Sequence, residues 1–229
     1  MTLALNPTHL NILTVLTRLA QRRPEETCRL ESAFVVGDLD TLLPVAIAVA
    51  VETGDPIGRV LANRVRATPD VTRAERIHDL LPYQTVALME VAEVVAGEVA
   101  EALRRRAADA GDDHTEDAPV VPRLAASLDK LAIALSDVGR REEALAAGEE
   151  AVELLGPFFK AAPQVFGERM RTVGNNYLRY CADLHRAPRG DLVLLLEAVL
   201  GKTRAEGPGL FTNKLTALVN FLKRFWNSG

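Results

Sequence analysis

The chain has 229 residues, which is enough for one domain, or two small ones, with a hydrophobic core. Hydrophobic residues make up 48% of the chain and aromatic residues only 5%, so the apolar side chains are mainly aliphatic and favour helices over sandwiches or barrels. The net charge of −4, with both signs interspersed, excludes the basic surface of a nucleic-acid-binding protein, and 25% charged residues exclude a disordered chain.

Asn6 and Pro7 begin the first predicted helix. Asparagine caps helix N-termini, and proline favours the first helical position. We expect this helix to end near Arg23, where Pro24 begins a second one. Its apolar face consists of four residues at helical spacing, Ile12, Val15, Leu16 and Leu19.

The second predicted helix runs from Pro24 to Gly37, which suits the left-handed conformation that follows many helices. Asp40 is expected to cap a third helix, which runs to residue 52 and stops at Gly54.

Proline-containing breaks at 55–56, 68–69 and 82 separate three further predicted helices. The last of these spans about 85–107. No segment shows sustained alternation of apolar and polar residues, and no hairpin signal is present. The sequence therefore predicts an all-α fold.

Residues 109–122 are polar and acidic and end with a proline, so we interpret them as an exposed loop. Their acidic residues and His114 do not have the spacing of a calcium-binding EF-hand loop. We predict no metal site here.

The segment 128–152 has the pattern of two antiparallel helices. Small side chains would let the helices approach closely, and Gly139 permits a tight turn between them. The small residues are Ala132, Ala144, Gly148 and Ala151.

With Leu128 at repeat position four, this segment resembles a tetratricopeptide repeat, in particular the longer-period repeats of bacterial regulatory proteins. The resemblance covers about residues 123–200. It implies an α-solenoid of antiparallel helix hairpins, with a C-terminal capping helix. Gly148 stands where the family usually has an aromatic residue, which predicts slightly looser packing of the pair.

A second unit lies around residues 173–184, and two registers compete for it. A shift of 42 places Val173 and Gly174 on the family's Leu-Gly positions. A shift of 46 instead makes residues 185–190 the turn, and we prefer it because Pro188 and Gly190 favour a turn. Its weakness is Leu178, which then stands where a small residue is expected.

We predict one continuous domain with four regions. Residues 1–108 form a helical region of degenerate repeats or an unrelated helical cap, and 109–122 form the acidic loop. Residues 123–205 contain the repeats, and 206–229 contain an amphipathic helix.

The resemblance also implies a binding surface, because the first helix of each tetratricopeptide hairpin lines the concave face. The corresponding residues are Asp129, Lys130 and Ile133 in the first unit, and Asn175, Asn176 and Arg179 in the second. Asparagine amides can donate to and accept from a peptide backbone, and arginine can bind a carboxylate with two hydrogen bonds.

Residues 210–226 carry an apolar stripe at helical spacing, formed by Leu215, Leu218, Val219 and Leu222. One interpretation is a helix that caps the solenoid. The alternative is a helix that binds a partner or a second copy of the chain.

The residue types that carry catalysis do not form a recognisable motif, so we predict no catalytic, cofactor-binding or metal-binding residues. The four histidines are scattered along the chain. Gly201-Lys202-Thr203 lacks the earlier glycine of a phosphate-binding loop.

Cys28 and Cys181 lie far apart, and no secretory signal precedes the first helix. The most apolar run, 42–51, is about half the length of a membrane span. We therefore expect a cytoplasmic protein.

The expected function is a protein- or peptide-binding scaffold that uses the concave face. The first alternative is a ligand-sensing regulatory module, related to those of signalling ATPases or caspase-like peptidases. A helical enzyme and a structural homodimer built on the C-terminal helix are further alternatives.

Overall fold

The computed structural model describes residues 6–81, 86–109 and 120–200, and within these ranges the chain is helical and has no strand. This confirms the all-α prediction. The α-helices are α1 (Pro7–Arg22), α2 (Thr27–Val36), α3 (Leu39–Thr53), α4 (Ile57–Ala67), α5 (Val71–Leu80), α6 (Met89–Asp109), α7 (Val120–Asp137), α8 (Arg141–Ala161), α9 (Pro163–Asp183) and α10 (Gly190–Leu200). Two single-turn 3-10 helices, η1 (Pro24–Glu26) and η2 (Val86–Leu88), precede α2 and α6.

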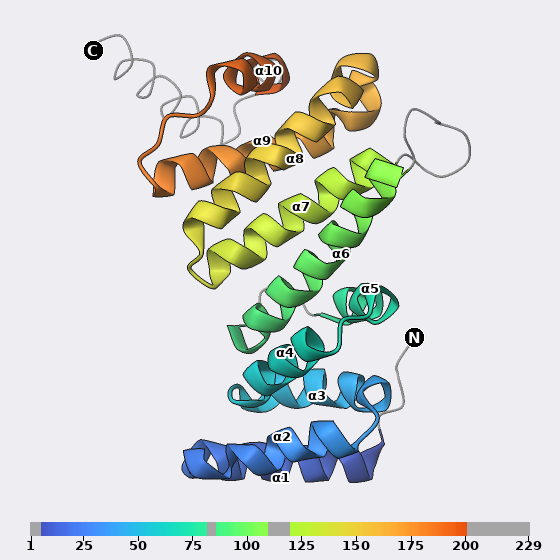
Figure 1. Ribbon diagram of the computed structural model, residues 1–229. Coiled ribbons are helices and arrows are strands. Elements are labelled where there is room, and N and C mark those ends of the chain that lie inside the picture. The colour runs from blue at the N-terminus through green and yellow to red at the C-terminus, as the bar shows by residue number, and fades with distance from the viewer. Residues whose placement is uncertain (1–5, 82–85, 110–119, 201–229) are drawn as a thin grey trace.

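The helices follow one another from one end of the molecule to the other, with α1 and α2 at one end and α9 and α10 at the opposite end (Figure 1). The α-helices that pack extensively against each other lie no more than two places apart in chain order. The packing is therefore local in sequence.

Helix α6 joins two apolar cores. Val91 and Val95, in its first half, pack in a core with residues of α1–α5. Ala100 and Leu103, in its second half, pack in a core with residues of α7–α10. Val99 lies between them and contacts both cores, so the two halves of the chain share one continuous helix.

Asn6 caps α1 as predicted, and its side-chain oxygen accepts a hydrogen bond from the backbone N–H of Thr8 at 3.0 Å. The predicted cap of α3 is wrong. Asp38 caps α3 by accepting from the N–H of Thr41 at 3.0 Å, whereas Asp40 lies inside the helix and pairs with Arg73. Both aspartates could supply the capping oxygen, and only Asp38 has the extended backbone that a cap requires.

The left-handed conformation expected at Gly37 is also wrong, because its φ is −80°. Gly54 does have positive φ, +79°, and ends α3 as predicted.

The predicted apolar face of α1 is wrong at Ile12 and Val15, whereas Leu16 packs against the core as expected. Ile12 is 49% exposed and Val15 is 65% exposed. The face that is buried instead consists of Leu13, Thr17 and Ala20. Thr17 can be buried because its hydroxyl donates to the Leu13 carbonyl oxygen at 2.7 Å.

The predicted turns of the two repeat-like units lie where expected. Gly139 lies between α7 and α8 with φ +82°, and His185 follows α9 with φ +52°. Residues 184–189 separate α9 from α10, which agrees with the turn that the shift of 46 predicts. The small residue that lets α10 approach α9 is Gly174, however, and not a residue at 178: a Cβ on Gly174 would overlap the side chain of Leu196.

Gly148 is also a site of close packing. A Cβ on it would lie 3.1 Å from the Tyr180 ring of α9, so this ring occupies the space beside the glycine. Residues 120–122, expected to belong to the acidic loop, form the first turn of α7. Residues 110–119 of that loop, and the predicted helix 210–226 with Leu215, Leu218, Val219 and Leu222, lie outside the described residues.

Candidate functional site

The six predicted binding residues lie on α7 and α9, two helices that pack against each other. Asp129, Lys130 and Ile133 belong to α7. Asn175, Asn176 and Arg179 belong to α9.

Asp129 and Asn176 join the two helices directly. The Asn176 side-chain N–H donates to the Asp129 carboxylate, with 2.9 Å between Nδ2 and Oδ1. Asp129 is only 8% exposed. Burial raises the pKa of the Asp129 carboxyl, and the hydrogen bond from Asn176 and the positive charge of Arg179 act in the opposite direction. A buried acid thus lies between α7 and α9.

Arg179 is exposed beside this pair. Its guanidinium carbon lies 5.1 Å from the centre of the Tyr180 ring, within the range of a cation–π contact, and an N–H donates to the Tyr180 hydroxyl at 3.3 Å. It forms no salt bridge with any described residue, so its two-pronged donor set is available to an anion.

Asn175 lies next to Asn176 on α9. Its side-chain oxygen is buried and has no hydrogen-bond partner among the described residues. Buried amide oxygens in native proteins are normally paired, so this unpaired oxygen is unusual.

Lys130 extends the polar surface toward α5. Its ammonium group contacts Nε2 of His78, which lies on α5. A hollow of about 40 Å³ opens beside this contact, and Ser127 is among the residues that line it. His78 and Ser127 were not predicted as site residues, because nothing in their sequence spacing relates them to Lys130.

Ile133 is half-buried one turn further along α7 and has no polar group to contribute. We refer to the surface formed by His78, Lys130, Asp129, Asn175, Asn176 and Arg179 as the polar face.

A different surface, formed by α6, α8 and the α9–α10 turn, is largely ion-paired within itself. Arg104 of α6 donates two hydrogen bonds to Glu150 of α8, at 2.9 and 2.6 Å. Arg189, in the turn, pairs with Glu149 at 2.9 Å and with Asp191 at 2.6 Å. These charges neutralise one another, so this surface offers less to a ligand than the polar face does.

Among the described residues, no group of three or more histidine, cysteine, aspartate or glutamate side chains could hold a metal ion. None of the described helices combines the length and the apolar composition that a bilayer span requires. Cys28 and Cys181 are both free thiols, exposed and buried respectively. Burial raises the pKa of the Cys181 thiol to about 11.

Comparison with known proteins returns no matching family model and no matching curated protein. The resemblance to tetratricopeptide repeats therefore depends on the residue pattern alone.

Proposed function

We propose that the chain is a scaffold or adaptor that binds an extended segment of another protein, or a peptide, on the polar face. The observation that carries the proposal is the hydrogen bond between Asp129 and Asn176. A carboxylate loses hydration when it is buried, and replacing such a group by an apolar one often leaves stability unchanged or improved. In this proposal Asp129 positions Asn176 through the hydrogen bond and attracts the guanidinium of Arg179, so it orients the residues that contact the peptide.

The proposal includes an arrangement of tandem hairpins similar to tetratricopeptide repeats. Two observations support it: the helices pack mainly with neighbours in chain order, and the turns at Gly139 and His185 share their position and their positive φ. In such arrays the first helices of successive hairpins line one concave surface, which is used for binding. Helices α5, α7 and α9 would have this role here.

The chemistry of the polar face favours a peptide with at least one carboxylate. Arg179 and Lys130 supply positive charge, and the guanidinium can hold a carboxylate with two hydrogen bonds. Asn175 is partly exposed, and its side-chain N–H groups can donate to a backbone carbonyl of the same peptide.

A ligand-sensing regulatory module is the alternative function. The hollow beside Lys130 has a volume of about 40 Å³, whereas pockets for drug-sized ligands measure about 300–1,000 Å³. The size of this hollow favours a peptide laid across the surface over a small molecule. We propose no catalytic activity for the polar face, and we place the protein in the cytoplasm, where its two thiols would stay reduced.

The test is selection of binders from a random peptide library with the full chain, followed by calorimetric measurement of affinity. Lys130→Glu and Arg179→Glu change exposed residues, so both variants should fold. We expect each to weaken binding of the selected peptides at least tenfold. Arg169→Glu, another exposed arginine of α9 that is not part of the polar face, is the matched control. Equal affinities for wild type and all three variants would rule out the polar face as the binding surface.

A further inference from the structure

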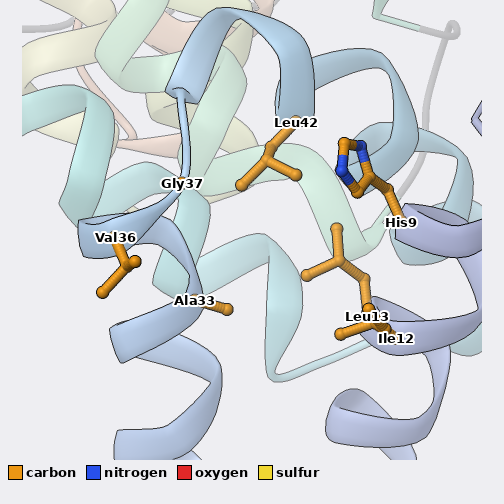
Figure 2. A pocket seen from close by; sticks show the side chains of 7 residues that line it. All are labelled: His9, Ile12, Leu13, Ala33, Val36, Gly37 and Leu42. Atoms are coloured by element: carbon orange, nitrogen blue, oxygen red, sulfur yellow. The ribbon is translucent and has the colours of Figure 1, made fainter.

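An apolar groove of about 230 Å³ lies at the α1–α2 end of the molecule, between α1, α2 and the beginning of α3 (Figure 2). We call it the N-terminal groove. Its apolar side chains are those of Ile12, Leu13, Ala33, Val36 and Leu42. His9 is the one polar side chain that lines it among the described residues.

The groove belongs to an apolar surface that no described helix covers. Val36 is 89% exposed and Ile12 is 49% exposed. Val15, one turn beyond Ile12 on α1, is 65% exposed. Contiguous exposed apolar surface commonly marks an interaction site, and the terminal units of helical arrays normally present a polar outer face. The terminal helices of this molecule depart from that rule.

His9 adds a polar group to the wall of the groove. Its Nδ1 is buried and has no hydrogen-bond partner among the described residues. His9 as a whole is only partly buried, so the accessible part of its ring can contact an occupant that carries polar side chains beside an apolar stripe.

Residues 210–226, which the structure does not describe, have the composition of such an occupant. Thr216 and Asn220 lie between the residues of the predicted apolar stripe, which are Leu215, Leu218, Val219 and Leu222. The segment also contains Trp226, the single tryptophan of the chain, and three of its seven phenylalanines. Aromatic side chains bury large apolar areas at interfaces.

The charges of the segment and of the rest of the chain are opposite. Residues 210–229 contain Lys214, Lys223 and Arg224 and no acidic residue, which gives a charge of +3. Because the whole chain has a net charge of −4, residues 1–209 carry −7. Asp38, next to Gly37 of the groove, presents an exposed carboxylate whose pKa is lowered by hydrogen bonds from Thr41. Opposite net charge favours encounter of the segment with a second copy of the chain.

We infer that residues 210–226 of one copy of the chain bind in the N-terminal groove of a second copy, with the apolar stripe facing Ile12 and Val36. The groove and α10 lie at opposite ends of the molecule (Figure 1). The shortest series of packed helices from α10 to α2 crosses five interfaces, or about 40–50 Å at the usual interaxial distances. Residues 201–214, which precede the stripe, span about 50 Å only when fully extended, so binding in the groove of the same chain would cost the ordering of this whole segment, a cost that a second copy avoids.

The interface joins two different surfaces, a groove on one copy and a segment on the next. Reciprocal exchange of the segments fills both grooves in a closed dimer, and exchange in one direction produces larger rings or open chains of copies. This distinguishes it from a symmetric dimer in which two C-terminal helices pair with each other.

The test measures the molar mass of the full chain by light scattering, together with the emission wavelength of Trp226, across a wide range of concentrations. We expect masses above the 24.9 kDa of one chain at high concentration, and a shift of Trp226 emission to shorter wavelength as the complex forms. Val36→Glu should keep the mass at the 24.9 kDa of one chain and leave Trp226 exposed to solvent. The variant should still fold, because Val36 is almost fully exposed. Val165→Glu is the matched control, since Val165 is also exposed and lies on α9, away from the groove.

A mixing experiment separates this arrangement from a dimer in which two C-terminal segments pair. Leu218→Asp combined with Leu222→Asp should also prevent association, because the apolar stripe is lost. Mixing this double variant with Val36→Glu should restore a complex of two chains, since one variant keeps an intact groove and the other an intact segment.

Three results would overturn the inference. The first is a mass of one chain at all concentrations, and the second is association that Val36→Glu leaves unchanged. The third is failure of the two variants to complement each other although wild type associates, which would indicate pairing between C-terminal segments.

Discussion

Gly139 and His185 occupy the same place in the α7–α8 turn and the α9–α10 turn. Each has positive φ, +82° and +52° respectively. The backbone hydrogen bonds are also the same after a shift of 46 residues. Arg140 donates to the Leu135 carbonyl and Gly139 to that of Ser136, and Arg186 and His185 donate in the same way to Cys181 and Ala182. Two segments with different side chains thus end their first helices in one backbone geometry.

This equivalence predicts opposite effects for two substitutions. Gly139→Ala should lower the free energy of unfolding by about 1 kcal/mol, because a Cβ is unfavourable at positive φ. His185→Gly should raise the free energy of unfolding, because it removes the strain of a side chain at positive φ. The gain should be smaller, up to about 1 kcal/mol, because glycine also gives the unfolded chain more conformational freedom, which offsets part of it. Urea denaturation of both variants measures the two changes, and loss of stability in His185→Gly would contradict the interpretation.

The helices of this fold were predictable because each has a strong local signal. Asn6, Gly54, Gly139 and several of the prolines mark helix ends to within a few residues, although Pro44 and Pro157 lie inside α3 and α8. The face that α1 buries was not predictable. A search for apolar residues at helical spacing treats Thr17 as polar and therefore misses it. Thr17 can be buried because its hydroxyl donates a hydrogen bond within its own helix.

The candidate site was predictable in part. The family pattern placed Asp129 and Asn176 on one face, but the sequence could not show that they bond to each other, because that depends on how α7 packs against α9. The contact of His78 with Lys130 depends on the position of α5, for which no repeat pattern exists.

The effect of Asp129→Asn on the free energy of unfolding should be more favourable at neutral pH than in acid. The folded state raises the pKa of Asp129 above the ordinary value of 3.8, so the native protein binds more protons than the unfolded chain in the range between the two values. Wild-type stability therefore falls as the pH rises through that range. The variant lacks this loss, and its asparagine oxygen can still accept from Asn176.

The difference in unfolding free energy, variant minus wild type, should grow from pH 3 upward and then level off. Thermal unfolding at several pH values measures it. Asp137→Asn, which removes an exposed charge from the end of α7, is the control. A difference that decreased with rising pH would show that Asp129 is stabilised in its charged form.

Gly58→Ala should destabilise the N-terminal half strongly. Gly58 is buried on α4, and a Cβ there would overlap the backbone carbonyl oxygen of Ala87. A backbone group cannot rotate away as a flexible side chain can, so we expect a loss at the upper end of the range of about 1–3 kcal/mol for overpacking, or more.

Gly190→Ala is the matched control, because a Cβ on Gly190 meets no atom within 4 Å. It should leave the melting temperature unchanged or raise it, since alanine is the better helix former. Equal melting temperatures for Gly58→Ala and wild type would mean that α4 and η2 are further apart than described.

Tyr177→Phe should loosen the connection between α9 and α10. The buried Tyr177 hydroxyl accepts a hydrogen bond from the backbone N–H of Arg189 at 2.9 Å. This bond holds the α9–α10 turn against α9. Phenylalanine keeps the ring and its packing but removes the acceptor, at a cost of about 1 kcal/mol.

Tyr180→Phe is the control, because among the described residues the Tyr180 hydroxyl hydrogen-bonds only with the exposed guanidinium of Arg179. Hydrogen exchange at the Arg189 amide should become faster in Tyr177→Phe and stay unchanged in Tyr180→Phe, and the same exchange rate in both variants would contradict an anchoring role for Tyr177.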